Sequence, residues 1–552
     1  MGTMHLTPLE VILRYPAHDY TLCGAFAGRA NAAAARPFLM LPDRTRCWSD
    51  FGDAVERAAR VLVSRGIVRG DRIGIVAGNS EAQVLLLFAC ARVGAIMVPV
   101  NPEYGVAEVR YVLQHAAVAA VLCSLATLET VRTACDALQP VPWLALVDGV
   151  QSAVPAFSAL LESAPVMTLP APGVADDTCV IIYTSGTTGF PKGVMHSQRN
   201  FILAGERHVM RVHLQPDDRV LCVLPMFHVN ALFNVLAGTL AAGACMIIAP
   251  RFSASAFWRL ATDTGATQVN VMAAVSTILA RRPRSEYVPG HRLRVVNGSG
   301  FTEETLAVFK HDFNVPTIIE GLGMTEIPGA FSNPFEGPHK LAAMGRPGLH
   351  PNPAQPWTQA RILDDDGRDV VAGMTGELAV KIPTLMQGYY RDPAQTSASF
   401  RDGWFMTGDL VRQDEDGYFL FVARKKDIIR RRGENIAGAE LDRVIAEMPG
   451  VAEVAAIAVP ADVGEEEVLV AIVCAAGVRL DVIAVRVWCA ARLAAHKVPR
   501  YVVFVDALPH TPTHKVAKHV LKADATLRSR AVDTTPATPA TPATPATPAT
   551  PA

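Results

Sequence analysis

One stretch indicates both the fold and the function: Tyr183-Thr-Ser-Gly-Thr-Thr-Gly-Phe-Pro-Lys-Gly193, which follows the apolar run Val180–Ile182. The apolar run predicts a strand that gives the stretch a rigid base. Three glycines let the backbone turn tightly and approach a ligand, while four Ser/Thr hydroxyls and one lysine supply donors without any acid. This composition favours a polyphosphate-binding loop over a flexible surface loop. It differs from the GxxxxGK[ST] phosphate loop, because Gly193 rather than Ser or Thr follows Lys192.

Length and composition bound the class of protein. A chain of 552 residues, 50% of them hydrophobic, is long enough for two or more globular lobes. The formal net charge of −1 provides no field that would attract nucleic acid or an anionic membrane. The ten cysteines form no CxxC pair and no Cys/His cluster, which indicates a reduced compartment and argues against structural zinc.

No targeting or membrane segment is expected. Residues 1–6 lack the pattern of a signal peptide, and Leu6 stands where the myristoylation pattern requires Ser or Thr. The apolar segments at 84–90 and 235–250 are too short or too interrupted by glycine to span a bilayer. We therefore predict a cytoplasmic protein with no transmembrane segment and no nucleic-acid partner.

Strands and helices alternate through the N-terminal part of the chain, which predicts an α/β fold of parallel-rich sheets with covering helices. Residues 358–423 change character, because short β-rich runs such as 377–382 and 418–422 lie between Asp/Gly turns. We expect a small β subdomain there. The expected order of the N-terminal part is strand 72–77, helix 81–93, strand 96–100, helix 106–115 and strand 118–123, with further strands near 219–224, 244–249 and 269–272.

The last part of the chain predicts a separate α+β unit and a tail. Apolar residues on one helical face near 441–448 are followed by strand patterns at 454–459, 468–474 and 501–505, with a helix at 481–495. Beyond about Arg530 the sequence becomes a Thr-Pro-Ala repeat. Proline at every third position prevents helix formation and favours an extended, disordered tail.

Five further motifs follow the glycine-rich stretch in a defined order. They are Gly321-Leu-Gly-Met-Thr-Glu326, Gly403-Trp-Phe-Met-Thr-Gly-Asp409, Arg424-Lys-Lys-Asp427, Gly433-Glu-Asn-Ile436 and Leu508-Pro-His-Thr-Pro-Thr-His-Lys515. Together with the glycine-rich stretch they resemble the adenylate-forming (AMP-binding) superfamily, in its acyl-CoA synthetase/ligase branch, over roughly Trp48 to Lys522. The segment around Gly433 is also similar to crotonobetaine/carnitine-CoA ligases.

The resemblance implies a domain organisation. A large N-terminal AMP-binding domain would span 1–423, a hinge 424–427 and a mobile α+β C-terminal domain 428–525, with the repeat tail at 526–552. Lys426 would be the pivot of the hinge, although its spacing alone would suggest an ordinary exposed lysine in a basic run.

The resemblance also implies a reaction in two steps. A carboxylate attacks the α-phosphorus of ATP, pyrophosphate leaves and an acyl-adenylate forms; the thiol of coenzyme A then attacks the acyl carbon and AMP leaves. The small-molecule acid, ATP, Mg²⁺ and coenzyme A are the expected substrates and cofactors, and a homodimer is one option for the assembly. Neither step requires a protein nucleophile, so the protein must position the reactants and neutralise phosphate charge.

Four residues are implied to be catalytic: Lys515, Thr325, Glu326 and His228. Lys515 would be carried by the mobile domain and would balance the charge of the transferring phosphoryl group. Thr325 would meet the α-phosphate and Glu326 would bind Mg²⁺, which needs few protein ligands because it keeps waters and phosphate oxygens. His228 would gate the CoA tunnel. Without the resemblance, Thr325-Glu326 would fit a helix N-cap equally well.

The implied binding residues form four groups. The nucleotide would contact the glycine-rich stretch, two glycine segments beside adenine, and the ribose-binding pair Asp409 and Arg424. The full nucleotide set is Thr184, Ser185, Gly186, Thr187, Thr188, Gly189, Lys192, Gly298, Ser299, Gly300, Gly321, Leu322, Gly323, Met324, Thr325, Asp409, Arg424 and Lys515. The hinge is Lys426, the CoA tunnel Gly433, Glu434 and Asn435, and the acyl pocket Phe227, Asn230, Phe233, Ala274 and Ile327. Arg430–Arg432 would meet the CoA phosphates or, alternatively, form a solvated charge run.

Four residues depart from the family pattern. Leu322 replaces the aromatic residue that stacks on adenine, and Ala423 replaces the glycine before the ribose-binding arginine. Gly438 stands in the place of a proline, which would loosen the loop after the tunnel motif. His514 replaces a glycine, so a left-handed backbone there would be strained.

The acid and the acceptor are less narrowly defined. Residues 227–240 contain no acidic side chain to pair with a substrate ammonium, and an unpaired buried cation would be costly. We therefore expect a short- or medium-chain or aryl carboxylic acid. Two alternatives to an acyl-CoA ligase stay open: a stand-alone adenylation enzyme that loads a carrier protein, and a non-catalytic nucleotide or acyl-adenylate binder.

Overall fold

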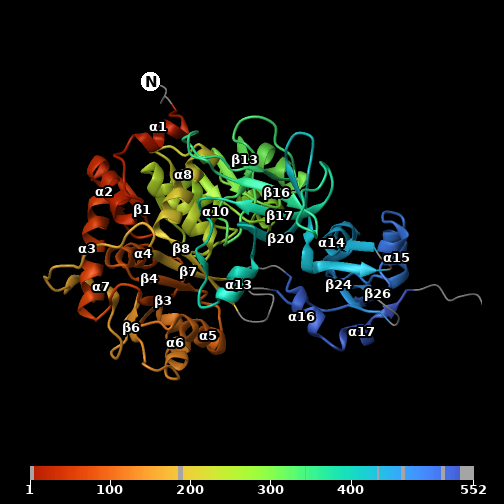
Figure 1. Ribbon diagram of the computed structural model, residues 1–552, viewed down its shortest axis with the longest axis horizontal. Helices are drawn as coiled ribbons and strands as arrows, with labels where there is room; N and C mark the ends of the chain where they lie inside the picture. Colours follow the sequence, from red (N-terminus) through yellow and green to blue (C-terminus); the bar gives the residue numbers. More distant parts are fainter. Residues whose placement is uncertain are drawn as a thin grey trace, which may run out of the picture. The chain divides into compact units, whose positions relative to one another are not determined.

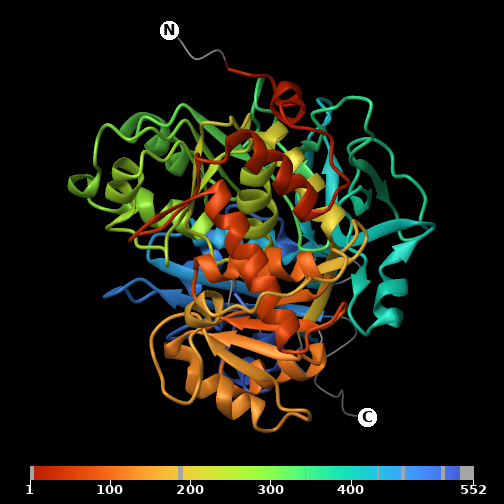
Figure 2. The same cartoon turned by 90° about the vertical axis from the view of Figure 1, so that its left-hand side faces the viewer.

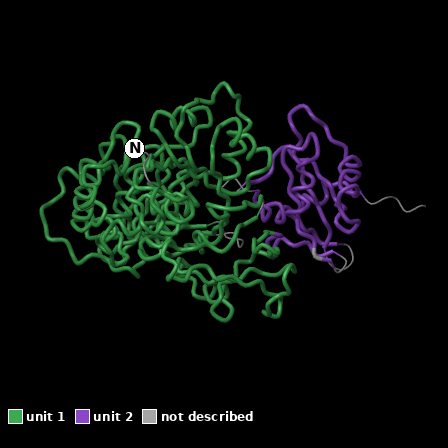
Figure 3. Tube along the Cα trace, turned by 90° about the horizontal axis from the view of Figure 1, so that it is seen from above, with its two compact units in different colours: residues 1–421 green, residues 422–552 purple. Residues whose placement is uncertain are grey.

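The structure is a computed structural model, and it describes residues 5–184, 191–341, 343–431, 434–461, 466–510 and 516–534. The chain forms two compact units, residues 1–421 and 422–552, coloured green and purple in Figure 3. The boundary between these units lies two residues before the start of the hinge proposed at 424–427. The hinge itself stays a prediction.

The first unit contains two mainly parallel sheets (Figure 1). In sheet one, β7, β4, β3, β5 and β6 run parallel, and β8 and β18 extend it antiparallel beyond β7. The expected alternation of strands and helices is confirmed here. The strands in sheet order are β18 (Gly388–Tyr389), β8 (Lys192–Ser197), β7 (Thr178–Thr184), β4 (Ile96–Val100), β3 (Arg72–Val76), β5 (Ala120–Cys123) and β6 (Trp143–Leu146).

Sheet two has the same character. Its strands run parallel from β13 to β1, and β2 closes the edge antiparallel. In sheet order they are β13 (Thr317–Glu320), β12 (Val295–Gly298), β11 (Gln268–Asn270), β9 (Arg219–Cys222), β10 (Cys245–Ile248), β1 (Pro37–Met40) and β2 (Thr45–Cys47).

The third sheet is antiparallel and corresponds to the predicted β subdomain. It begins earlier in the sequence than residue 358, because β14 and β15 join it through β21. Its strands are β14 (Phe331–Ser332), β15 (Ala343–Pro347), β21 (Phe419–Arg424), β20 (Trp404–Gln413), β17 (Gly376–Lys381) and β16 (Gln359–Leu363), with β19 (Phe400–Arg401) beside β20.

Helices cover both faces of sheet one, as the side-chain alternation along its strands requires (Figures 1 and 2). Ile73 and Ile75 of β3 belong to the core cluster shared with α3 and α4. Val76 and Val121 belong to a second cluster, shared with α5 and α6. The helices of this unit include α1 (Pro8–Leu13), α2 (Leu22–Ala33), α3 (Trp48–Ser64), α4 (Glu81–Val93), α5 (Val106–Ala116), α6 (Leu128–Cys135), α7 (Phe157–Glu162), α8 (Gln198–Val212), α9 (Ala237–Ala242), α10 (Phe257–Asp263), α11 (Ala273–Arg281), α12 (Glu303–Ala307) and α13 (Pro393–Ala398).

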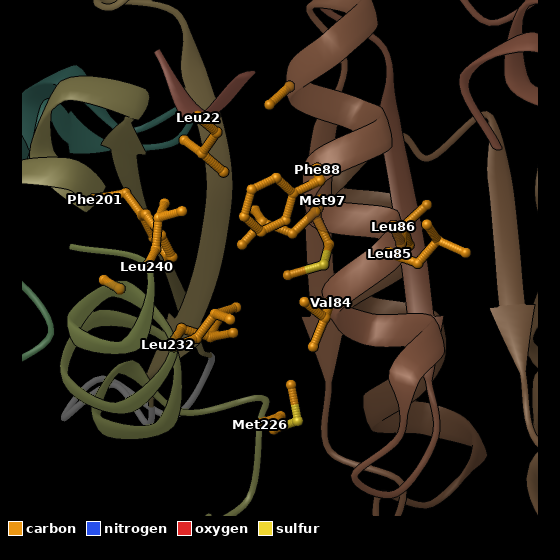
Figure 4. Packing of buried hydrophobic residues seen from close by; sticks show 14 of the residues in the cluster. Leu22, Val84, Leu85, Leu86, Phe88, Met97, Phe201, Met226, Leu232 and Leu240 are labelled. Carbon is orange, nitrogen blue, oxygen red and sulfur yellow. The ribbon is translucent and has the colours of Figure 1, made fainter. Parts of the chain in front are cut away.

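One apolar core joins the two parallel sheets. Phe88 of α4 and Met97 of β4 face Phe201 of α8, Leu232 and Leu240 (Figure 4). All five side chains are 0–3% exposed. Helix α8 is therefore fixed between the sheets. Because the surrounding core is close-packed, residues at the sheet edges next to this helix cannot move independently of it.

Two predicted elements differ in extent from the observed ones, and a helix cap explains the first. The strand predicted at 118–123 begins at Ala120, because Ala117 ends α5 in the left-handed conformation (φ 48°) and Val118 N donates to Leu113 O. The helix predicted at 481–495 ends at Ala490.

The second unit is a small α+β unit, as predicted. β24, β25, β26 and β27 form one sheet, and β22 pairs with β23 in a hairpin. The elements are β22 (Ile428–Arg431), β23 (Glu434–Ala437), α14 (Gly438–Ala446), β24 (Val451–Pro460), β25 (Glu466–Cys474), α15 (Val482–Ala490), β26 (Tyr501–Phe504), α16 (Lys518–Ala523), α17 (Leu527–Arg530) and β27 (Val532–Asp533).

Candidate active site

A β-hairpin holds the two ends of the glycine-rich stretch. β7 and β8 pair antiparallel, with Thr184 opposite Lys192, and β7 is bounded on its other side by β4. Residues Cys179–Ile182 are buried, so the base of the hairpin is fixed in the core. Thr184 and Lys192 are half-buried. The other predicted phosphate-binding residues lie outside the described residues: Ser185, Gly186, Thr187, Thr188 and Gly189.

Lys192 and Glu326, the predicted phosphate and magnesium ligands, both contact one tyrosine. Lys192 Nζ lies 5.3 Å from the centre of the Tyr389 ring and donates a 2.8 Å hydrogen bond to Gln395 Oε1. The Tyr389 hydroxyl donates to Glu326 Oε1 at 2.9 Å. The structure thus brings together two residues that are 134 positions apart in the sequence (326 − 192).

Glu326 has the features of a magnesium ligand. It lies with Thr325 in the irregular turn between β13 and β14, where Met386 N donates to Glu326 O at 2.9 Å. The carboxylate is half-buried, and within the described ranges its Oε2 has neither a hydrogen bond nor an ion pair. Nowhere in the described chain do three His, Cys, Asp or Glu side chains group as a metal site. One carboxylate oxygen with open access still fits Mg²⁺, which takes its other ligands from water and phosphate.

His196 on β8 supports this turn from behind, and the sequence analysis missed it. Its Nε2 is 2.7 Å from Thr325 O, and its Nδ1 is 3.2 Å from Asn200 Nδ2. Burial lowers the pKa of His196 to about 4, so the ring is neutral near pH 7. With Nδ1 accepting from Asn200, Nε2–H donates to the Thr325 carbonyl. No sequence signal distinguishes this histidine from a core residue.

Polar residues gather where three strands of sheet two end. Asn270, Asn297 and Glu320 lie at or next to the carboxyl ends of β11, β12 and β13, and all are 1–5% exposed. Glu320 Oε1 accepts a 3.1 Å hydrogen bond from Phe301 N, which ties the turn after β12 to β13. Burial raises the pKa of Glu320 to about 7. Ligands of open α/β sheets bind at this edge, so the predicted adenine segments are in a suitable place.

The glycines of these segments are explained by packing within the protein. A Cβ on Gly298 would lie 2.7 Å from Val271 O, and one on Gly321 would lie 2.4 Å from Arg211 Nη2. A side chain at either position would therefore collide with protein atoms. Gly300, with φ 75°, is required by the backbone conformation.

The remaining adenine residues belong to the same turns. Leu322 and Phe331 exchange two backbone hydrogen bonds of 3.1 Å, which close the turn between β13 and β14. Leu322 and Met324 are half-buried against the core of the third sheet. Ser299 is also half-buried, and Gly323 is exposed.

The predicted acyl-pocket residue Asn230 ends a buried chain of hydrogen bonds. Asn270 Nδ2 donates to Asn230 Oδ1 at 2.7 Å, and Gln268 Nε2 donates to Asn270 Oδ1 at 2.8 Å. Asn230 is half-buried, whereas Gln268 and Asn270 are buried. The amide at position 230 therefore has a defined orientation rather than a free rotamer.

The other predicted pocket residues differ in exposure. Phe227 and His228 are half-buried, with ring centres 4.3 Å apart, and they line a cavity of about 10 Å³ together with Tyr183. Phe233 and Ile327 are 0% exposed, and the Phe233 ring packs 4.7 Å from that of His196. Phe233 is thus part of the core behind this region. Ala274 is exposed, near the start of α11.

Asp409, the predicted ribose ligand, is 1% exposed in the middle of β20. The pairing of β20 with β17 is shifted here, and Gly408 adopts φ 71°. Asp409 N donates to Thr407 Oγ1 at 3.1 Å, which stabilises this local kink in the strand.

In the second unit the predicted residues lie on its first strands. Arg424 is half-buried at the end of β21, and Lys426 is exposed. Glu434 is exposed at the start of β23; Gly433, the side chain of Asn435, and Lys515 are outside the described residues. Arg431 is buried, pairs with Glu467 at 2.5 Å and donates to His496 O and Val498 O. Its expected contact with CoA phosphates is wrong, because its guanidinium is engaged inside the unit.

The expectation of a loosened loop at Gly438 is wrong. This glycine is the first residue of α14 rather than part of a loose loop, so the residue is constrained by a helix start. Proline is common at that position because no intrahelical bond needs its N–H.

None of the helices in the described ranges is both long and apolar enough to cross a membrane. The ten cysteines are free thiols.

Comparison with protein families matches both units. The AMP-binding enzyme family matches residues 26–390, and the AMP-binding enzyme C-terminal domain matches residues 440–515. The first match alone covers more than half of the chain.

Similar proteins are CoA ligases. The chain is 33% identical to a sulfoacetate–CoA ligase of Cupriavidus necator, over 90% of this chain and 96% of that protein. It is 33% identical to an indoleacetate–CoA ligase of Aromatoleum aromaticum, over 89% and 95%. It is 30% identical to a crotonobetaine/carnitine–CoA ligase of Proteus mirabilis, over 86% and 92%.

The fold agrees with these relatives. The crystal structure of ATP-bound MatB from Rhodopseudomonas palustris superposes with a TM-score of 0.80 at 28% identity, covering 91% of this chain and 98% of that one. The chain belongs to the AMP-binding enzyme family and, within it, to the acid–thiol ligases that form acyl-CoA.

Proposed function

We propose that the protein is an ATP-dependent ligase that activates a short- or medium-chain or an aryl carboxylic acid as its acyl-adenylate and transfers the acyl group to coenzyme A. The observation that carries this proposal is the arrangement of Lys192, Tyr389 and Glu326 beside the glycine-rich stretch. A cation for phosphate and a carboxylate for metal lie close together without neutralising each other.

Lys192 is suited to bind phosphate. Its ammonium bonds to the neutral amide of Gln395, and no ion pair with an acid is found for it within the described ranges. Exchanging an amide oxygen for a phosphate oxygen gains charge attraction, because both partners are then ionised. The hairpin backbone keeps the lysine at the border of the loop while this exchange takes place.

Glu326, whose Oε2 has no hydrogen bond or ion pair with any residue that the structure describes, would hold Mg²⁺. When bound, this ion would neutralise charge on the phosphates and orient them for in-line attack. Thr325 is the neighbour of Glu326 in the chain, and the hydrogen bond between His196 and the Thr325 carbonyl fixes the turn that holds both residues. A hydroxyl at that position would donate to the α-phosphate as charge develops there.

The proposed class of carboxylic acid substrate rests on the residues around Asn230. The segment 227–240 contains no acidic or basic side chain other than His228, so a charged substrate tail would have no partner there. The relatives are named for sulfoacetate, indoleacetate and crotonobetaine/carnitine, which differ in charge and size. Membership of the family therefore does not define the tail of the acid substrate. The composition of residues 227–240 favours an apolar or aromatic tail.

The test is pyrophosphate release from ATP and Mg²⁺ across a panel of C2–C12 and aryl acids, with and without CoA. Sustained turnover that requires both an acid and CoA is the expected result. Release that CoA does not sustain would instead favour loading of a carrier protein. Binding of ATP without any turnover would favour a non-catalytic binder. Sulfoacetate and carnitine serve as charged members of the panel, and preference for either would contradict the apolar tail.

Lys515→Ala separates the two steps. Lys515 lies outside the described residues, and its role rests on the resemblance of the Leu508–Lys515 motif. We expect a fall of roughly 100-fold or more in adenylate formation, because loss of a charge-stabilising donor costs about that much. Thioester formation from preformed acyl-adenylate should stay within a few-fold of the wild type. Equal loss of both steps would contradict the role, and Lys310→Ala, which removes an exposed lysine of the first unit, provides the control.

A further inference from the structure

Tyr389 is a rigid residue at the centre of the candidate site. It ends the two-residue strand β18, which pairs with β8 so that Tyr389 lies opposite Val194. Its amide donates to Thr396 Oγ1 at 2.9 Å, and the next amide, of Tyr390, donates to Gly193 O at 2.7 Å. The residue is 9% exposed. Its backbone is therefore held on the same hairpin that borders the glycine-rich stretch.

The side chain of Tyr389 touches two groups of opposite charge in different ways. Its hydroxyl donates to Glu326 Oε1 at 2.9 Å, which fixes one oxygen of that carboxylate. Its ring face lies 5.3 Å from Lys192 Nζ, a distance at which the ring attracts a cation. Lys192 and Glu326 form no ion pair with each other in the described chain, although both contact the same side chain.

This placement has a chemical consequence. A direct pair between Lys192 and Glu326 would satisfy both charges and compete with phosphate on one side and metal on the other. A phenol between them satisfies only one carboxylate oxygen and leaves the ammonium its remaining donors. Oε2 of Glu326 then stays without a partner among the described residues and keeps a fixed direction, because Oε1 cannot rotate away.

We propose that Tyr389 is a positioning residue: it directs Glu326 Oε2 towards Mg²⁺ and keeps Lys192 from closing an ion pair with Glu326. This inference rests on the proposed function, in which Glu326 is the magnesium ligand. Residues that hydrogen-bond to a metal-binding carboxylate commonly change metal affinity by roughly 10- to 100-fold when altered.

The test compares Tyr389→Phe with the neighbouring Tyr390→Phe. Both remove one phenolic oxygen, but the Tyr390 hydroxyl lies 3.4 Å from Ala116 O and does not reach Glu326. Mn²⁺ binding is measured by calorimetry in the presence of an ATP analogue whose α,β-bridge is a methylene group. We expect Tyr389→Phe to weaken Mn²⁺ binding about 10-fold and Tyr390→Phe to change it less than twofold.

Three results would overturn the proposal. The first is wild-type Mn²⁺ affinity in Tyr389→Phe, and the second is an equal loss in Tyr390→Phe, which would show a general effect on the strand. The third is full additivity with Glu326→Gln, because a residue that acts through Glu326 must lose its effect when that carboxylate is gone. Thermal midpoints of all variants identify any loss caused by unfolding.

A second variant tests the ion-pair part. Tyr389→Leu also removes the ring, so Lys192 is expected to reach Glu326 and the KM for ATP to rise further than in Tyr389→Phe. Identical KM values in the two variants would remove this part of the proposal. Failure of the proposed function is distinguishable, because the wild type itself would then show no metal-dependent pyrophosphate release.

Discussion

The two parallel sheets of the first unit share an architecture but differ at the carboxyl ends of three neighbouring strands in each. In sheet one, β3, β4 and β5 end in Val76, Val100 and Cys123, which are all buried in an apolar cluster. In sheet two, β11, β12 and β13 end with Asn270, Asn297-Gly298 and Glu320, also buried but polar.

This difference indicates which strand ends of two similar sheets can orient a ligand. Buried polar groups cost free energy unless they are bonded, so they persist where they orient a ligand or a turn. Sheet one contributes to the site through β7 and β8, which border the glycine-rich stretch, and through β18, which carries Tyr389. Sheet two presents three polar strand ends side by side, which is the position where open α/β sheets bind ligands.

The largest effect is expected from a substitution among the buried polar residues at the carboxyl ends of β11, β12 and β13. Asn270→Ala removes the donor to Asn230 Oδ1 and one of the two partners of Gln268 Nε2, which keeps only His208 Nε2 at 3.3 Å. We expect a loss of about 2–3 kcal/mol in the free energy of unfolding. We also expect a rise of roughly tenfold in the KM for the acid, because Asn230 loses its orientation. Urea unfolding and steady-state kinetics measure the two effects.

Cys123→Ala is the matched change at the end of β5 in sheet one. It removes a buried thiol and should cost about 1 kcal/mol in unfolding free energy without altering the KM for the acid. An unchanged acid KM in Asn270→Ala, or an equal change in Cys123→Ala, would remove the functional distinction between the two edges.

A second prediction concerns the titration of Glu320. Burial raises its pKa to about 7 from 4.5, so between these values the folded protein binds more protons than the unfolded chain. Stability from this group is therefore present below about pH 4.5 and is lost as pH rises through 7, by about 3 kcal/mol. Glu320→Gln, which resembles the protonated acid and still accepts from Phe301 N, should be more stable than the wild type at pH 8.

The comparison with sheet one sharpens this test. Cys123→Ala should shift the stability of the protein by the same amount at pH 5 and at pH 8. Glu320→Gln should differ from the wild type by several degrees in thermal midpoint at pH 8 and by little at pH 5. Parallel pH profiles for the wild type and Glu320→Gln would show that the carboxyl at the end of β13 does not titrate in this range.

Much of sheet one was predictable because each element has its own local signal. Strand 96–100 and helix 81–93 agree with β4 and α4, since a buried apolar run and a capped helix are short-range patterns. No expectation existed for α8. Its charged residues, including Glu206 and Arg207, suggest solvent exposure, yet they are buried.

Contacts between residues far apart in sequence explain that difference. Glu206 contacts His18 at 3.3 Å and His350 at 3.0 Å. Burial alone would raise the pKa of Glu206, but the hydrogen bonds and charges of the two histidines outweigh it and lower the pKa to about 2. These partners come from segments on either side of α8 that no local pattern connects. A charged helix can be buried only where such partners meet it, and this meeting is a property of the fold.

The residues of the candidate site also form two groups, those that a local motif predicts and those that only the fold reveals. Lys192 and Glu326 were predicted because they belong to ordered motifs. Tyr389 and His196 were not, because their roles arise from hydrogen bonds across 63 and 129 residues of sequence. Motifs therefore predict which residues meet the ligand, whereas the residues that orient them become visible only in three dimensions.

The smallest expected effect concerns Leu322, which follows the polar end of β13 by two residues. Its backbone is paired with Phe331 in both directions, so a substitution changes the side chain while the turn keeps its path. Leu322→Tyr would restore an aromatic surface beside the polar edge. Aromatic stacking is worth about 0.5–1.5 kcal/mol, so the Kd for AMP should fall roughly two- to tenfold.

Calorimetry of AMP binding to Leu322→Tyr, Leu322→Phe and Leu322→Met measures this effect. The two aromatic variants should gain affinity, and Leu322→Met, of similar size to leucine but without a ring, should not. A gain in the methionine variant would attribute the effect to packing. If neither aromatic variant gained affinity, the base would not lie over position 322, and the polar strand ends of sheet two would have to orient something other than adenine.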